Sequence, residues 1–98
     1  MLDLEMRGAL ETIADAVINA IPNLASSMKQ EEAEMLMVKN NDDYLLGYAH
    51  GAIMGSFSTT FVAANKRPTN EEEYQQAREI VYNRTNEIMK AIFKANEG

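Results

Sequence analysis

Residues 44–65 form a stretch without a single Asp, Glu, Lys or Arg, and a glycine recurs in it at every fourth position. In an α-helix this spacing places the glycines in one row along one edge. The row consists of Gly47, Gly51 and Gly55, continued by Thr59. Glycine in a helix interior costs about 0.5–1 kcal/mol relative to alanine, so such a row is expected where another helix approaches closely. We therefore predict a central helix over residues 42–65, with these four residues as its helix-packing surface.

Two other interpretations of the uncharged stretch compete with a buried helix. Its length approaches that of a membrane span, and small residues four apart also occur between membrane helices. A histidine, two tyrosines and several Ser and Thr residues within it, together with amphipathic neighbouring segments, disfavour insertion into a membrane. Residues 57–62 also have strand propensity, which is a weak guide on its own. We expect the stretch to be a helix of a bundle and not a membrane span.

Two helices are predicted before the central one. Residues 3–21 carry apolar side chains at three- and four-residue spacing with polar residues between them, the pattern of an amphipathic helix. Pro22 lacks a backbone donor, so this helix is expected to end or kink near residue 20. Ser27 followed by Gln30 matches a capping box and predicts a short helix over residues 28–39.

A fourth helix is predicted over residues 70–95. Thr69 and Glu72 have the spacing of a capping box at its start. Apolar residues then recur at seven-residue intervals, as expected for a helix with one buried face. On the central helix, the bulky side chains predicted to form the buried stripe are Leu46, His50, Ile53, Met54, Phe57 and Phe61.

Length and composition narrow the classes of function. A chain of 98 residues with 46% hydrophobic and 24% charged residues is long enough for one globular domain, residues 1–98. The absence of cysteine excludes disulfides, thiolate metal sites and a cysteine nucleophile. A net charge of -6 without a basic cluster argues against direct binding of nucleic acid through phosphates. The first residues lack a basic segment followed by an apolar run, so we expect a cytoplasmic protein.

His50 is the one histidine and the natural candidate for a ligand-binding site, with Tyr44 and Tyr48 as neighbours. A catalytic or metal-binding histidine needs partners such as carboxylates, and none lies within one turn of it on the same helix. A histidine in the core or at an interface, with its ring hydrogen-bonded, is the favoured interpretation. We therefore predict no catalytic residues, no metal ion and no cofactor.

A run of apolar residues in the second predicted helix is the candidate partner-binding surface. Four consecutive apolar side chains span more than one face of a helix, so one edge stays available after a core is filled. The run consists of Met35, Leu36, Met37 and Val38. Methionine adapts its shape to different partners, although it also fills irregular cores.

These observations predict an all-α fold: a small antiparallel bundle of about four helices around a central glycine-rich, uncharged helix, completed by homodimerisation. The leading functional hypothesis is a non-enzymatic, acidic interaction protein that acts as an adaptor, regulator or inhibitor of a larger protein. The alternative is a bundle that binds a small molecule or metal, or a minor enzyme, with its site around His50. A weaker alternative is mimicry of nucleic-acid charge by acidic residues, namely Asp3, Glu5, Glu11, Asp15, Glu31, Glu32 and Glu34.

Overall fold

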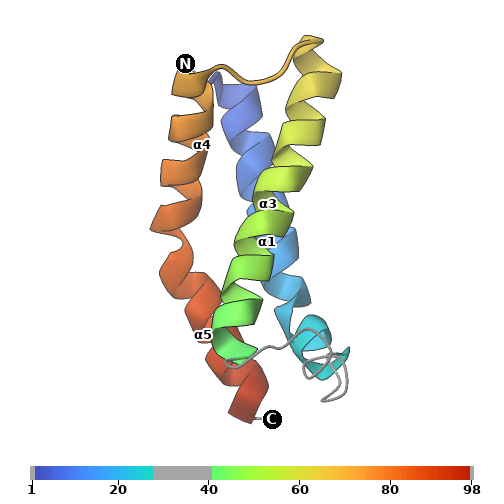
Figure 1. The fold of residues 1–98 in the computed structure, drawn as a ribbon, viewed down its shortest axis with the longest axis vertical. Coiled ribbons are helices and arrows are strands. Elements are labelled where there is room, and N and C mark those ends of the chain that lie inside the picture. Colours follow the sequence, from blue (N-terminus) through green and yellow to red (C-terminus); the bar gives the residue numbers. More distant parts are fainter. Residues whose placement is uncertain (1, 28–40, 98) are drawn as a thin grey trace.

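The protein is an all-α bundle in a computed structural model that describes residues 2–27 and 41–97. Neither range contains a β-strand, and residues 57–62 are helical. The described helices are α1 (Leu4–Ser27), α3 (Asn41–Asn65), α4 (Glu71–Asn83) and α5 (Thr85–Glu97). Helix α3 runs antiparallel to α1, and α4 and α5 follow one another along the third side of the bundle (Figure 1). The predicted all-α bundle is confirmed.

The hydrophobic core lies where one row of each helix faces inward. On α3 the buried side chains recur at every fourth position: Leu45, Ala49, Ile53, Phe57 and Phe61. The predicted stripe was only partly right, because Leu46, His50 and Met54 are half-buried at the edge of this face. Other helices bury Leu10 and Ala14 of α1, Ala77 and Val81 of α4, and Ile88 and Ile92 of α5.

Helix α1 continues through Pro22 to Ser27, so of the two predicted outcomes near residue 20, an end or a kink, the end is wrong. Proline removes one intrahelical hydrogen bond, but the turn that contains it also carries apolar side chains into the core. Ile21 is fully buried, and Leu24 and Ala25 pack against the core cluster. This burial offsets the missing bond. The second predicted helix, over residues 28–39, and its capping box lie outside the described residues.

The last predicted helix is two helices, α4 and α5, and its start differs by one residue from the prediction. The N-cap of α4 is Asn70, whose side chain accepts a hydrogen bond of 2.8 Å from the backbone N–H of Glu73. Glu73 in turn accepts a 2.9 Å bond from the backbone N–H of Asn70. Asn70 and Glu73 therefore form the capping box that was predicted at Thr69 and Glu72.

Arg84 separates α4 from α5 and ties both to α1. Its backbone N–H donates 3.0 Å to the carbonyl of Val81, which closes the last turn of α4 tightly. Its guanidinium donates to the Glu11 carbonyl at 3.2 Å and to the carboxylates of Asp15 at 2.5 Å and Glu87 at 2.7 Å. The side chain is 14% exposed, so these contacts are partly shielded from water. The predicted continuous helix is interrupted at Arg84, whose side chain joins distant parts of the chain.

The length and apolarity of α3 do not make it a membrane span. Among the helices of residues 2–27 and 41–97, none is long and apolar enough to cross a bilayer.

Candidate functional site

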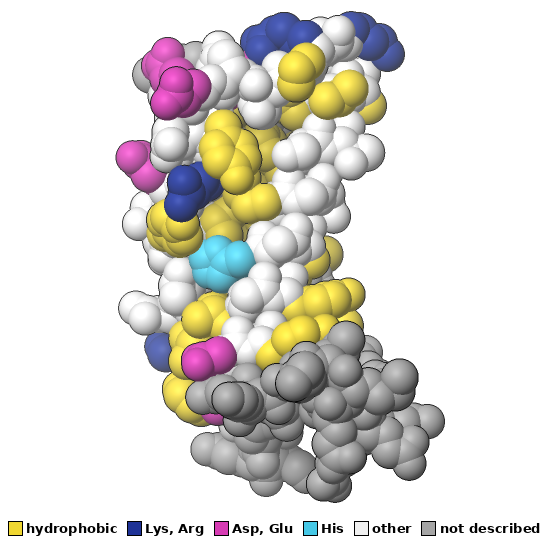
Figure 2. Space-filling view, viewed as in Figure 1, with side chains coloured by type: hydrophobic (Ala, Val, Ile, Leu, Met, Phe, Trp, Pro, Cys, Tyr) yellow, Lys and Arg dark blue, Asp and Glu magenta, His cyan; other side chains and the backbone are white. Residues whose placement is uncertain are grey.

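The glycine row of α3 faces away from the core. Gly47 lies two positions after the buried Leu45, which corresponds to about 200° around a helix. A Cβ atom built on Gly47, Gly51 or Gly55 would meet nothing within 4 Å. Figure 2 shows α3 as a pale, uncharged strip along the front of the molecule. No helix in the described part of the chain packs against the row, so the predicted contact is not found within these residues.

The surface that continues this row is weakly polar. Thr59 donates its hydroxyl to the carbonyl of Gly55 at 3.2 Å, so this polar group already has a partner. Beside it, a shallow apolar hollow of about 480 Å³ is lined by Ser58, Thr59, Val62 and Ala63. Val62 and Tyr48 are large apolar or aromatic side chains that remain nearly half exposed. We call Gly47, Gly51, Gly55 and Thr59 together the glycine face.

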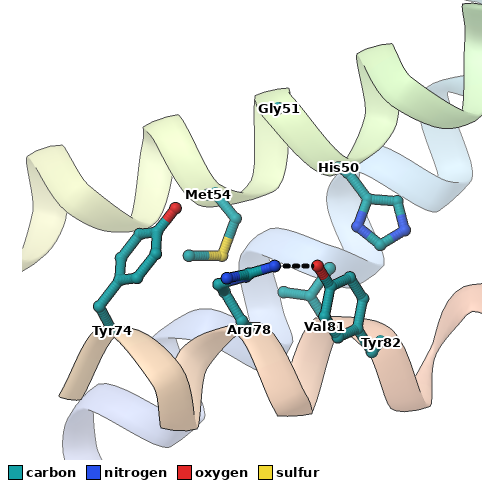
Figure 3. A pocket seen from close by; sticks show the side chains of 7 residues that line it. All are labelled: His50, Gly51, Met54, Tyr74, Arg78, Val81 and Tyr82. Atoms are coloured by element: carbon teal, nitrogen blue, oxygen red, sulfur yellow. Dashed lines mark hydrogen bonds between the residues drawn. The ribbon is translucent and has the colours of Figure 1, made fainter. Parts of the chain in front are cut away.

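A second feature is a half-open groove of about 450 Å³ between α3 and α4. Figure 3 shows its lining from both helices. The lining residues are His50, Gly51, Met54, Tyr74, Arg78, Val81 and Tyr82. Among them, Arg78 is the one with a permanent formal charge. The groove therefore combines one cation with aromatic and apolar walls.

Arg78 is held in place by tyrosines one turn before and one turn after it on α4. Its guanidinium carbon lies 5.9 Å from the centre of the Tyr74 ring and 5.3 Å from that of Tyr82. One guanidinium N–H also donates to the Tyr82 hydroxyl. This hydrogen bond raises the pKa of Arg78, so the side chain is charged throughout the physiological range.

His50 stands at one end of the groove. Its ring centre is 5.6 Å from that of Tyr82, and its Nε2 lies 3.5 Å from the Thr85 hydroxyl. Burial lowers the pKa of His50, which favours the neutral imidazole. The predicted companions Tyr44 and Tyr48 lie with their ring centres 6.4 Å apart and do not line this groove.

The groove residues on α4 were missed in the sequence, although a signal was present. Tyr74, Arg78 and Tyr82 are spaced by four residues and so share one face of a helix. Their meeting with His50 depends on how α4 packs against α3, which local spacing does not specify.

The described residues offer no metal centre, since no three of their His, Asp or Glu side chains are grouped to hold an ion. Several of the acids in the nucleic-acid mimicry hypothesis have partners within the chain. Glu11 and Asp15 contact Arg84, and Asp3 accepts a 2.8 Å bond from the backbone N–H of Met6. Glu31, Glu32 and Glu34 and the apolar run Met35, Leu36, Met37 and Val38 lie outside the described residues.

No family model, curated protein or solved structure matches this chain. Function is therefore inferred from the glycine face and the groove.

Proposed function

We propose that the protein is a non-enzymatic interaction protein whose working unit is a homodimer formed through the glycine face of α3. The observation that carries this proposal is the open position of Gly47, Gly51 and Gly55 on a helix face without charge, opposite the core. Each such glycine costs about 0.5–1 kcal/mol relative to alanine. Nothing in the described part of the chain packs closely enough to offset this cost.

A second helix can offset it by packing against bare backbone. Rows of residues four apart on two helices interdigitate at an angle of about -50°, so the contact follows the row itself. Without side chains in the way, the backbones approach closely and gain dispersion contacts and Cα–H···O contacts. The hydroxyl of Thr59 does not oppose this burial, because it already donates to the carbonyl of Gly55.

A second copy of this chain is the occupant that fits the charges. The chain carries a net charge of -6, and the uncharged face lets two copies meet without bringing like charges together. Asp42 and Asp43 lie in the first turn of α3, and Lys66 follows its end. An antiparallel pair places these acids of one copy near Lys66 of the other. In an antiparallel pair the two helix dipoles also point in opposite directions, which is favourable for helices side by side, whereas in a parallel pair they repel.

The mass in solution tests this proposal. Size-exclusion chromatography with light scattering over a dilution series should give twice the monomer mass at high concentration and a falling mass on dilution. Gly51→Leu should shift the chain to the monomer, because a leucine there prevents close approach. Gly8→Leu is the matched control, since Gly8 is exposed on α1 and also has open space around it. A mass of 11.0 kDa at every concentration would contradict the dimer.

The wider role that we propose is binding to a larger protein, as an adaptor, regulator or inhibitor. The chain is small and acidic and has an open, uncharged helix face, which supports action through contacts with another protein. The apolar run at residues 35–38 stays the predicted contact surface for that partner.

A further inference from the structure

The groove between α3 and α4 has the composition of a binding site for an anion. Arg78 is the one formally charged side chain among its described lining residues, on a chain whose net charge is -6. A guanidinium has five N–H donors, and the Tyr82 hydroxyl accepts from one of them. Four N–H donors remain, and a carboxylate can accept two parallel hydrogen bonds from a guanidinium.

The cation is ordered before any ligand arrives. Arg78 lies over the rings of Tyr74 and Tyr82 and is hydrogen-bonded to the second of them. A long side chain that is already restricted loses less conformational freedom on binding, so a larger part of its interaction contributes to affinity. This distinguishes Arg78 from Arg7, which is exposed on α1.

The rest of the groove suits the planar apolar part of a ligand, such as an aromatic ring. Met54 and Val81 supply apolar surface, and the rings of Tyr74, Tyr82 and His50 supply aromatic surface (Figure 3). Gly51 has no side chain, so the α3 wall is low at that point. A volume of about 450 Å³ accommodates one or two aromatic rings.

We propose that this groove binds a small planar aromatic carboxylate, with Arg78 holding the carboxylate and the tyrosines and Met54 contacting the ring. A single guanidinium matches a single negative charge. A phosphate dianion lacks a second cation here and is repelled more strongly by the acidic chain. The site borders the proposed dimer contact, because Gly51 belongs to both, but its affinity for an anion depends on Arg78 and not on close helix packing.

The proposal is tested with 2-naphthoate as the probe, titrated into the 15N-labelled full chain while amide NMR signals are followed. Saturable shifts should centre on His50, Met54 and residues 74–82, with a Kd on the order of 1 mM or tighter. Two matched probes separate the contributions: 2-naphthalenemethanol keeps the rings without the charge, and inorganic phosphate keeps a charge without the rings. Both should bind at least about tenfold more weakly. Light scattering at the same protein concentration records the mass, so a failed dimer and a failed ligand site give different results.

Two variants locate the carboxylate. Arg78→Gln should weaken 2-naphthoate binding about tenfold or more, whereas Arg7→Gln, with the same change in net charge, should leave it within about twofold. Circular dichroism of both variants verifies that helicity is retained, and the shift map of the unsubstituted chain stands even where a variant fails to fold. Equal binding of the alcohol, equal binding of phosphate, shifts outside the groove, or the absence of saturation would each overturn the proposal.

Discussion

At the scale of single residues, Glu73 is a buried carboxylate that accepts three hydrogen bonds. Both of its oxygens accept from Arg67, at 2.7 and 2.9 Å, and one also accepts from the backbone N–H of Asn70. Its side chain is 5% exposed, whereas that of Arg67 is 50% exposed. The hydrogen bonds from Arg67 and Asn70 lower the pKa of Glu73 to about 2. One side chain thereby fixes both the end of the α3–α4 connection and the start of α4.

Glu73→Gln should make the free energy of unfolding less dependent on pH in the acidic range. The pKa of the carboxyl is lowered on folding, so its contribution is complete above the ordinary value of 4.5 and is lost as the pH falls toward 2. Urea unfolding should therefore show the natural chain more stable than the variant near neutral pH, with a difference that shrinks below about pH 4.5. A difference that stays constant down to about pH 3 would contradict this role. Asn70→Ala, which removes the other half of the capping box, should destabilise by about 1 kcal/mol.

At the scale of elements, the junction between α4 and α5 depends on Arg84. Its guanidinium bridges the carboxylates of Asp15 on α1 and Glu87 on α5, and these carboxylates raise its pKa. Arg84→Met keeps an apolar stem of similar length and removes the charge. We expect a loss of about 1–3 kcal/mol in the free energy of unfolding, more than for an isolated surface pair.

Arg7→Met is the control for this substitution, because Arg7 is exposed on α1. It should change the free energy of unfolding by less than about 0.5 kcal/mol. The difference between the two variants, measured by urea unfolding, should shrink in about 1 M salt because the ion pairs are partly screened. Equal losses for both variants would mean that the bridge contributes no more than an ordinary surface charge.

A substitution in the glycine face should have opposite effects on stability in the monomer and in the dimer. In the dilute monomer, Gly51→Ala should stabilise by about 0.5–1 kcal/mol, because alanine favours the helix and its Cβ meets open space. Gly8→Ala on α1 should do the same. At concentrations where the dimer forms, only Gly51→Ala should lose stability. Identical behaviour of the two variants over the whole range of concentration would mean that no helix packs on α3.

Sequence patterns predicted the presence of the helices better than where each helix ends or which of its faces is buried. Contrast between apolar and polar positions was clear on α1 and α4, and there Leu10, Ala77 and Val81 are buried as their spacing indicates. The central helix has no charged side to mark its outer face. The prediction was therefore right at Ile53, Phe57 and Phe61, but it placed Leu46 and His50 in the core where the neighbouring Leu45 and Ala49 are buried. At the helix break, Arg84 contacts Asp15, 69 residues away on α1, and local patterns carry no information about such contacts.

For the candidate sites, too, some residues could be recognised in the sequence, whereas their arrangement depends on tertiary packing. His50 was recognisable as a lone titratable side chain in an apolar stretch, and the row of Tyr74, Arg78 and Tyr82 was recognisable by its spacing. The groove itself exists because α4 lies beside α3 at that level. The orientation of the glycine face toward open space also follows from tertiary packing, since the same row would be covered if α3 were rotated by half a turn.

At the scale of the whole molecule, the absence of cysteine allows a direct test of how two copies are arranged. Gly47 and Thr59 stand at opposite ends of the glycine face, 12 residues or about 18 Å apart along α3. In an antiparallel dimer, position 47 of one copy lies opposite position 59 of the other, whereas equal positions lie far apart. A disulfide needs Cα atoms within about 7 Å, so its formation reports this arrangement.

Gly47→Cys and Thr59→Cys chains, prepared separately and then mixed under mild oxidation, should form the mixed disulfide in preference to either symmetric one. Intact-mass spectrometry distinguishes the three products, because the two substitutions change the mass by different amounts. Gly8→Cys, on the exposed surface of α1, measures the background of random collisions. Symmetric disulfides in excess would indicate parallel helices, in which Asp42 and Asp43 of both copies lie at the same end and repel. Yields no higher than that of the α1 control would mean that the two copies do not meet through α3.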